Sequence, residues 1–201
     1  AGDYDDMVHD QPRSEVGGMV QEMVGDFAKA RRFDHLSVAQ LHPSGNIPAY
    51  LAHALSTLMN NNTIVEEVAP VEVPYEREVV TWMNMNIVGY DGASAGGNLT
   101  SGGTMANYTA QLLARKRSER EGWDGKEPAV IIANEMAHYS IKKSAEGLAP
   151  SNLIRVEHAP LQRNSLKVDV EKLNDKVTSL RRSGARILSI VGIAGQTETG
   201  L

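Results

Sequence analysis

Cysteine is absent from the 201-residue chain, which excludes disulfide bonds, cysteine-ligated metal sites and cysteine nucleophiles. The chain also has no excess of positive charge: 20 lysines and arginines stand against 25 aspartates and glutamates, a net charge of −5. It therefore lacks the basic surface that non-specific binding to nucleic-acid phosphates requires. No apolar run reaches the roughly 20 residues that cross a bilayer, and no signal peptide is evident. We expect a soluble cytoplasmic protein that binds neither nucleic acid nor membrane.

Apolar sequence is present in the amount that a sizeable core needs, because 41% of the residues are hydrophobic. In the first part of the chain the apolar residues recur at helical spacing. This spacing predicts helices from Ser14 to Phe27, over residues 47–59, and from Pro74 to Gly89. Residues 1–80 are therefore expected to form a helical N-terminal segment.

The pattern changes after residue 100 to an alternation of helices and short apolar strands. Strands are predicted at residues 129–133, 152–156 and 185–193, and helices at 104–121, at 139–147 and after Asp169. Strands that are apolar almost throughout, alternating with helices, are typical of a mostly parallel sheet covered by helices on both faces. We therefore expect an α/β fold over residues 81–201.

A glycine-rich stretch, "GGNLTSGGTMAN" at residues 96–107, leads directly into the predicted helix 104–121. A helix N-terminus offers unpaired N–H groups and a partial positive charge, so it is suited to binding an anion. Gly102 and Gly103 would let the backbone close around a phosphate, and Ser101 and Thr104 could donate hydroxyl hydrogen bonds. The alternative is a tight turn whose Ser or Thr caps the helix. The spacing matches neither the P-loop nor the dinucleotide-binding fingerprint.

Two further loops follow predicted strands. One carries His138, after the strand at 129–133, and the other carries Thr197, after the strand at 185–193. If the strands are parallel, these loops and the glycine-rich stretch open onto the same edge of the sheet, where ligands bind in α/β folds. A histidine there could stack on a flat ring or transfer protons. The alternative is a surface histidine at the start of a helix.

Several of these segments resemble the group II amino-acid decarboxylases, which depend on pyridoxal phosphate and include glutamate, aromatic amino-acid and diaminobutyrate decarboxylases. The resemblance runs from about residue 36 to the end of the chain. It rests on "HP" at 42–43, "NNNTIVEEVAPVEVPYEREVVTWM" at 60–83, "TSGGTMAN" at 100–107, "AHYSIKKSAEG" at 137–147 and "VGIAGQTETG" at 191–200. The resemblance implies fold type I, the aspartate-aminotransferase-like fold of this class, and a pyridoxal 5'-phosphate cofactor that takes up electrons during decarboxylation.

The resemblance also implies a role for each matching residue. Gly103 and Thr104 would bind the cofactor phosphate, with Ser101 and Gly102 shaping the same cup. His138 would lie on the pyridine ring and act in catalysis, and Thr197 would contact the cofactor. No metal site is implied. The family further implies an amino-acid substrate and a homodimer with active sites at the subunit interface.

The sequence departs from the family pattern at two places. Gln196 stands where the family usually has Thr, and the segment after "HP" lacks an aromatic pair, so the substrate does not carry over. In the family, the Schiff-base lysine and the acid that pairs with the pyridine nitrogen lie downstream of position 201. Lys142 and Lys143 match family lysines that have neither role. The resemblance therefore implies that residues 81–201 are the first part of the large domain, and that this chain alone is inactive.

Two alternatives stay open at this point. The first is a carbon–carbon lyase of the sphingosine-phosphate lyase type, which shares a similar glycine-rich motif; the stretch around His138 favours a decarboxylase. The second is a non-catalytic module that binds phosphate or nucleotide. It would bind phosphate ligands without ever showing cofactor absorbance.

Overall fold

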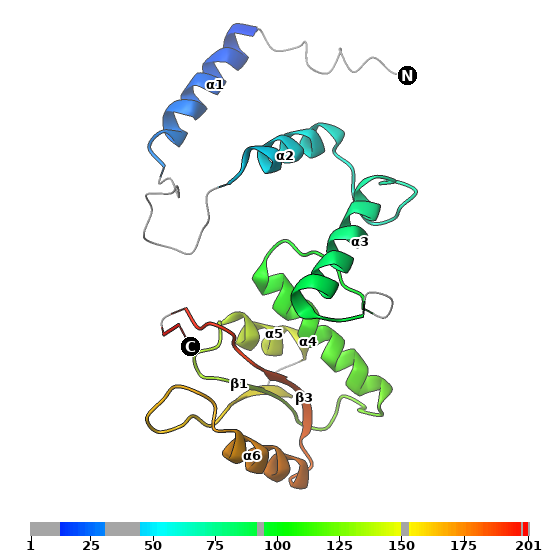
Figure 1. Ribbon diagram of the computed structural model, residues 1–201, viewed down its shortest axis with the longest axis vertical. Helices are drawn as coiled ribbons and strands as arrows, with labels where there is room; N and C mark the ends of the chain where they lie inside the picture. The colour runs from blue at the N-terminus through cyan, green and yellow to red at the C-terminus, as the bar shows by residue number, and fades with distance from the viewer. Residues whose placement is uncertain (1–12, 31–44, 92–94, 150–152, 198, 201) are drawn as a thin grey trace. The chain divides into compact units, whose positions relative to one another are not determined.

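The computed structural model describes residues 13–30, 45–91, 95–149, 153–197 and 199–200 (Figure 1). The chain divides into two compact units, residues 1–70 and 71–201. The described part of the first unit contains two helices, α1 (Arg13–Phe27) and α2 (Ile47–Met59). None of the described helices has the length and apolar character needed to span a bilayer.

Both helices of the first unit expose apolar side chains, among them Met19 and Phe27 on α1 and Leu51 and Leu58 on α2. Helix α1 begins at Arg13, so the prediction of a start at Ser14 is one residue late. The ends of α2 follow from local chemistry. The Asn46 side chain accepts a hydrogen bond from the Ala49 N–H at 2.9 Å, and Asn60 ends the helix in the left-handed conformation that asparagine tolerates.

The second unit begins with α3 (Glu72–Met83), which continues into one π-helical turn, η2 (Asn84–Val88). Gly89 ends this turn at φ 79°, a left-handed conformation that favours glycine. The predicted helix from Pro74 to Gly89 is therefore present, although its last turn is wider than an α-helix. The apolar pattern that predicted it does not distinguish the two kinds of turn.

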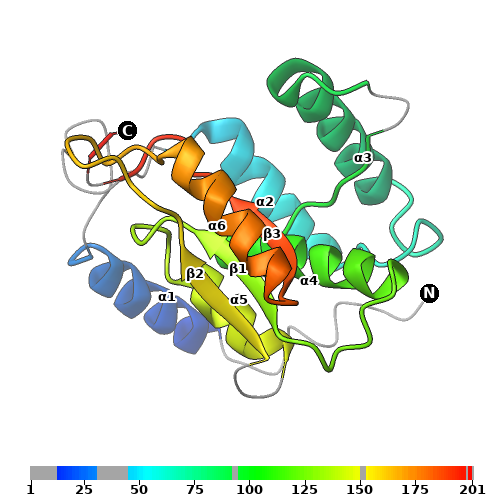
Figure 2. The ribbon, with the colours of Figure 1, turned by 90° about the horizontal axis from the view of Figure 1, so that it is seen from below.

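Three parallel strands and three helices form the rest of the unit as far as its residues are described. They are α4 (Gly103–Arg120), β1 (Ala129–Ala133), α5 (Ser140–Leu148), β2 (Ile154–His158), α6 (Val170–Arg182) and β3 (Arg186–Val191). The strand order is β2-β1-β3, and β1 pairs in parallel with both neighbours. Figure 1 and Figure 2 show α4 and α5 on one face of the sheet and α6 on the other. The predicted α/β fold with both faces covered is confirmed.

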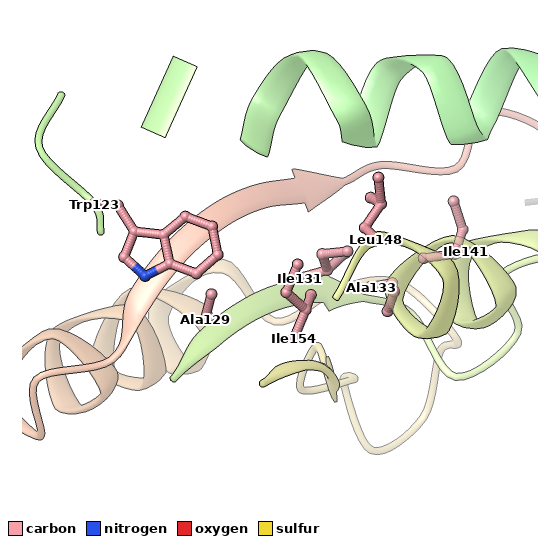
Figure 3. Packing of buried hydrophobic residues seen from close by; sticks show 8 residues of the cluster. Trp123, Ala129, Ile131, Ala133, Ile141, Leu148 and Ile154 are labelled. Carbon is pink, nitrogen blue, oxygen red and sulfur yellow. The ribbon is translucent and has the colours of Figure 1, made fainter. Parts of the chain in front are cut away.

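Each face of the sheet has its own apolar core because successive side chains of β1 point to opposite faces. Ile131 packs with Trp123, Ile141 and Leu148 on the face covered by α4 and α5 (Figure 3). On the opposite face, Val130 and Ile132 pack with Leu180 of α6, Ala159 and Ala185. All five residues of β1 are buried. The central strand is therefore enclosed, as its unbroken apolar sequence predicted.

Charged side chains tie α6 to the edge strand β2. Lys176 of α6 contacts the Glu157 carboxylate at 2.9 Å and donates a hydrogen bond to the His158 carbonyl at 2.8 Å. Arg155 binds the same carboxylate at 2.9 Å. Hydrogen bonds from Lys176 and then from Arg155 hold the pKa of Glu157 below its usual range. The start of α6 is fixed by Asp169, which caps the helix as predicted.

Candidate functional site

The fold creates a crevice at the carboxyl ends of β1 and β3. The chain leaves β1 through α5 to reach β2 on one side, then crosses through α6 to reach β3 on the other. The last residues of β1 and β3, Ala133 and Val191, are paired in register. Ligands in open α/β sheets bind outside the strand ends where the order reverses in this way.

A hollow of about 320 Å³ lies at this point. Its lining comes from three segments: the first turns of α4, the loop between β1 and α5, and the loop after β3. Asn107, His138, Gln196 and Thr197 supply its polar side chains. Two residues singled out from the sequence, His138 and Thr197, are therefore brought to one hollow although they are far apart in the chain.

The glycine-rich stretch ends at the start of α4, as predicted. Gly102 occupies the cap position, where it offers no side chain to the helix, and the first backbone bond inside the helix runs from the Ala106 N–H to the Gly102 carbonyl at 3.0 Å. A side chain added at Gly102 or Gly103 would meet no atom within 4 Å of its Cβ. The space beside these two glycines is therefore open, which rules out a tight packing role for them.

Two hydrogen bonds hold the approach to this helix. The Leu99 N–H donates to the Glu76 carboxylate of α3 at 2.7 Å, and the Thr100 hydroxyl donates to the Gly102 carbonyl at 3.1 Å. Ser101 and Thr104, predicted to donate to a phosphate, have exposed side chains and lie outside the lining of the 320 Å³ hollow. Asn107, one turn further along α4, belongs to that lining and connects the helix start with the hollow.

His138 is held on both sides by its neighbours in the sequence. Its Nδ1 lies 2.8 Å from the Ser140 hydroxyl and 3.3 Å from the Ser140 backbone nitrogen. The Tyr139 ring lies against the imidazole with centroids 4.1 Å apart and the planes tilted by 37°. The Asn107 amide in turn donates to the Ser140 hydroxyl at 2.8 Å. The imidazole is thus fixed at the mouth of the crevice by two helices.

Gln196 organises the loop that carries Thr197. Its side-chain oxygen accepts hydrogen bonds from the Thr199 N–H at 2.7 Å and the Thr199 hydroxyl at 2.9 Å, and its backbone carbonyl accepts from the Gly200 N–H at 2.7 Å. The residue is only 8% exposed. The family usually has threonine at this position. The longer Gln196 side chain places a buried amide oxygen within the turn, where it accepts both hydrogen bonds from Thr199.

Three residues of this arrangement were not predicted as site residues: Asn107, Ser140 and Gln196. Asn107 and Ser140 lie within the motifs that pointed to the site, but no sequence pattern shows that they meet. Lys142 and Lys143 have exposed side chains on α5. The Lys143 ammonium lies 4.7 Å from the centre of the Tyr139 ring, a cation–π contact.

Two known proteins with similar sequences are decarboxylases. The chain is 27% identical to an aspartate 1-decarboxylase of Aliivibrio fischeri, over 83% of this chain and 37% of that protein. It is 30% identical to an L-2,4-diaminobutyrate decarboxylase of Rhizobium meliloti, over 82% of this chain and 32% of that protein. The chain thus spans about a third of the length of these relatives.

A solved structure shows the same fold. The glutamate decarboxylase domain of the diaminobutyrate-pyruvate transaminase and L-2,4-diaminobutyrate decarboxylase from Vibrio parahaemolyticus superposes with a TM-score of 0.74. The two chains are 25% identical, and the match covers 96% of this chain and 43% of the other. Residues 21–201 match the pyridoxal-dependent decarboxylase conserved domain. The chain therefore belongs to the pyridoxal-dependent decarboxylase family.

Proposed function

We propose that the protein to which this chain belongs removes CO₂ from an L-amino acid and leaves the corresponding amine, with pyridoxal 5'-phosphate as its cofactor. One observation carries this proposal: His138 and Thr197 line the same hollow at the carboxyl ends of β1 and β3. This is the position at which α/β folds bind ligands. Membership of the pyridoxal-dependent decarboxylase family supports decarboxylation as the reaction carried out at this hollow.

The residues present fit the cofactor's phosphate. A dianion needs several N–H or O–H donors and gains from a positive helix end. At the start of α4 the backbone N–H groups of Gly103 and Thr104 are available for this purpose, and Ser101 and Thr104 add hydroxyl donors. The cap position is a glycine without a side chain, and the space around Gly102 and Gly103 is open. We infer that these four residues bind the phosphate.

The residues also fit a flat heteroaromatic ring. His138 presents an imidazole whose orientation is fixed, and Tyr139 lies against one side of it, so we infer that the cofactor ring lies against the other. Thr197 would contact the cofactor from the loop that Gln196 holds closed. When bound, the cofactor supplies a conjugated system that accepts the electron pair released from the bond between Cα and the carboxylate.

His138 has two tasks under this proposal. Its ring plane holds the cofactor plane, which fixes the direction in which the substrate's breaking bond points. Its imidazole can also hold or deliver a proton close to the substrate. Both tasks require an imidazole of fixed orientation, which the contacts with Ser140 provide.

We propose that the enzyme acts in amino-acid metabolism in the cytoplasm as a homodimer with its active sites at the subunit interface. The exposed apolar side chains of α1 and α2 support an assembly of this kind. We further propose residues 1–80 as a helical segment and residues 81–201 as the first part of the cofactor-binding domain. The two compact units, residues 1–70 and 71–201, divide ahead of α3, whereas the proposed boundary lies within that helix.

The test is product analysis with the full-length protein. Purified enzyme with pyridoxal phosphate is incubated with single L-amino acids, starting with aspartate and 2,4-diaminobutyrate, on which the relatives act according to their names. We expect CO₂ and the amine in equal amounts from at least one of them, and no CO₂ from residues 1–201 alone. An aldehyde formed together with a phosphoethanolamine-like product, and without CO₂, would instead indicate a carbon–carbon lyase of the sphingosine-phosphate lyase type. Phosphate binding without cofactor absorbance would indicate a non-catalytic module.

A further inference from the structure

We propose that Ser140, itself oriented by Asn107, is a positioning residue that fixes the neutral imidazole of His138 in the tautomer with its proton on Nε2. The consequence for catalysis rests on the proposed function. The tautomer itself is a property of the folded chain and can be measured without turnover.

The argument starts at Nδ1 of His138. The Ser140 backbone nitrogen lies 3.3 Å away, and a backbone N–H can only donate. The Ser140 hydroxyl lies 2.8 Å from the same Nδ1. A ring nitrogen that receives a backbone N–H must offer its lone pair, so Nδ1 carries no proton. In a neutral imidazole the proton is then on Nε2.

Asn107 sets the direction of the second hydrogen bond. Its amide nitrogen lies 2.8 Å from the Ser140 oxygen and donates to it. With its oxygen accepting from Asn107, the Ser140 hydroxyl can direct its own hydrogen toward Nδ1. The three groups therefore form one chain of donors, from Asn107 to Ser140 to His138. If the amide were reversed, Ser140 would donate to Asn107, and Nδ1–H would have to point at both the hydroxyl oxygen and the backbone N–H.

The chain of donors is rigid because its middle member is enclosed. Ser140 is 0% exposed, at the first position of α5. Its carbonyl accepts a hydrogen bond from the Ser144 hydroxyl at 2.7 Å, one turn along the same helix. Asn107 comes from α4, which packs on α5 through Leu112, Ile141 and Leu148. Two packed helices thus hold the imidazole in one orientation.

A fixed tautomer matters because the two ring nitrogens do different work. With Nδ1 engaged by Ser140, Nε2 is the ring atom that holds the transferable proton. His138 lines the hollow in which the reaction is proposed. Ser140 would therefore keep a proton donor available at Nε2, and the opposite tautomer would leave that atom with only a lone pair.

The test uses full-length enzyme with ¹⁵N-labelled histidine. His138→Gln identifies the His138 signals among those of the six histidines in this chain and of any elsewhere in the protein. Long-range proton–nitrogen correlations then report which ring nitrogen is protonated. We expect Nε2–H in the parent at a pH where the ring is neutral. A parent spectrum with the proton on Nδ1 would overturn the inference, whatever the activity.

Four variants test whether Ser140 and Asn107 are what fixes the tautomer of His138. In Ser140→Ala only the backbone contact of 3.3 Å remains at Nδ1, which is longer than an ordinary hydrogen bond, so the tautomers should mix. Ser140→Thr keeps the hydroxyl and should keep the parent pattern. Asn107→Asp introduces a group that cannot donate, so the Ser140 hydroxyl should turn toward it and the Nδ1–H form should gain population. Ser144→Ala is the matched control: it removes a buried hydroxyl of α5 that does not touch His138, and should leave the tautomer unchanged.

Kinetics separate this inference from the proposed function. Ser140→Ala should lower kcat by about 10- to 100-fold with a smaller change in KM, the range seen when the partner that orients a metal-bound histidine is removed. Ser140→Thr should recover most of the loss. An unchanged tautomer in Ser140→Ala would contradict the role of Ser140. A changed tautomer with unchanged kcat would leave the positioning intact and contradict the proton-transfer role of His138 instead.

Discussion

The Ser189 hydroxyl of β3 donates a hydrogen bond of 2.6 Å to the side-chain oxygen of Gln111 on α4. Gln111 is only 4% exposed, so this bond lies between the helix and the sheet. It joins the helix that begins at the glycine-rich stretch to the strand that leads to Thr197. Together with the Arg186 side chain of β3, which donates to the Ser118 hydroxyl of α4 at 2.7 Å, this pair ties α4 to β3 on the two sides of the proposed cofactor site.

We predict that Gln111→Met destabilises the protein by about 1–3 kcal/mol, because it leaves the half-buried Ser189 hydroxyl without this acceptor. Replacing both partners, as Gln111→Met with Ser189→Ala, should recover most of that loss, since neither side then buries an unpaired polar group. Chemical denaturation of the full-length protein measures both. A double variant as unstable as the single one would show that lost packing, and not the lost hydrogen bond, causes the destabilisation.

His138→Ala in the full-length enzyme should lower turnover far more than it lowers stability. Acid–base catalysis by a positioned side chain contributes about 10²- to 10⁴-fold, so the loss should be easy to measure. His138→Phe should retain more cofactor binding than the alanine variant, because it keeps a flat ring, while remaining slow. Turnover within about twofold of the parent, far below this range, would reduce His138 to a residue at the start of α5.

Gly103→Leu should weaken binding of the cofactor while leaving the fold intact. A Cβ at this position meets no protein atom within 4 Å, so the new side chain clashes only with what binds there. Gly96→Leu is the matched control, because Gly96 lies in the same stretch and has equally open surroundings. Cofactor titration followed by absorbance measures both variants. Equal affinities would place the phosphate elsewhere.

Acidification should loosen the contact between α6 and β2. The pKa of Glu157 is lowered by Lys176 and Arg155, so the stabilising contribution is complete above the pKa of an unfolded glutamate, about 4.3, and disappears as the pH falls through the lower folded value. Lys176→Met should therefore flatten the dependence of unfolding on pH in that acidic window. An identical pH profile for parent and variant would show that the pair contributes nothing measurable.

The sheet was predictable because its strands carry their burial in their sequence: β1 is apolar at every position and buried at every position. The end of β2 was harder to predict from the sequence. The strand runs from Ile154 to His158, two residues later than predicted, because the polar residues Glu157 and His158 continue an edge strand whose outer side chains reach solvent. In an edge strand polar residues can lie within the strand, so the change from apolar to polar sequence does not mark where the strand ends.

The candidate site was predictable only in part, for the same kind of reason. His138 and Thr197 could be assigned to one edge of the sheet once parallel strands were expected, because strand direction alone decides where the loops go. The contact between Asn107 and Ser140 could not, because it joins side chains 33 residues apart on two helices, and its existence depends on how α4 turns about its axis. The role of the buried Gln196 amide could not be predicted either. The sequence shows only that Gln196 differs from the usual family residue, and the folded loop shows that its amide oxygen binds Thr199.

The central claim is that the start of α4, His138 and Thr197 form one pyridoxal-phosphate site. A crystal structure of the full-length protein with bound cofactor tests it most directly. We predict phosphate oxygens within hydrogen-bond distance of the Gly103 and Thr104 N–H groups, with the pyridine ring lying on the His138 imidazole and Thr197 in contact with the cofactor. A phosphate bound away from the start of α4, or a ring that does not touch His138, would contradict it.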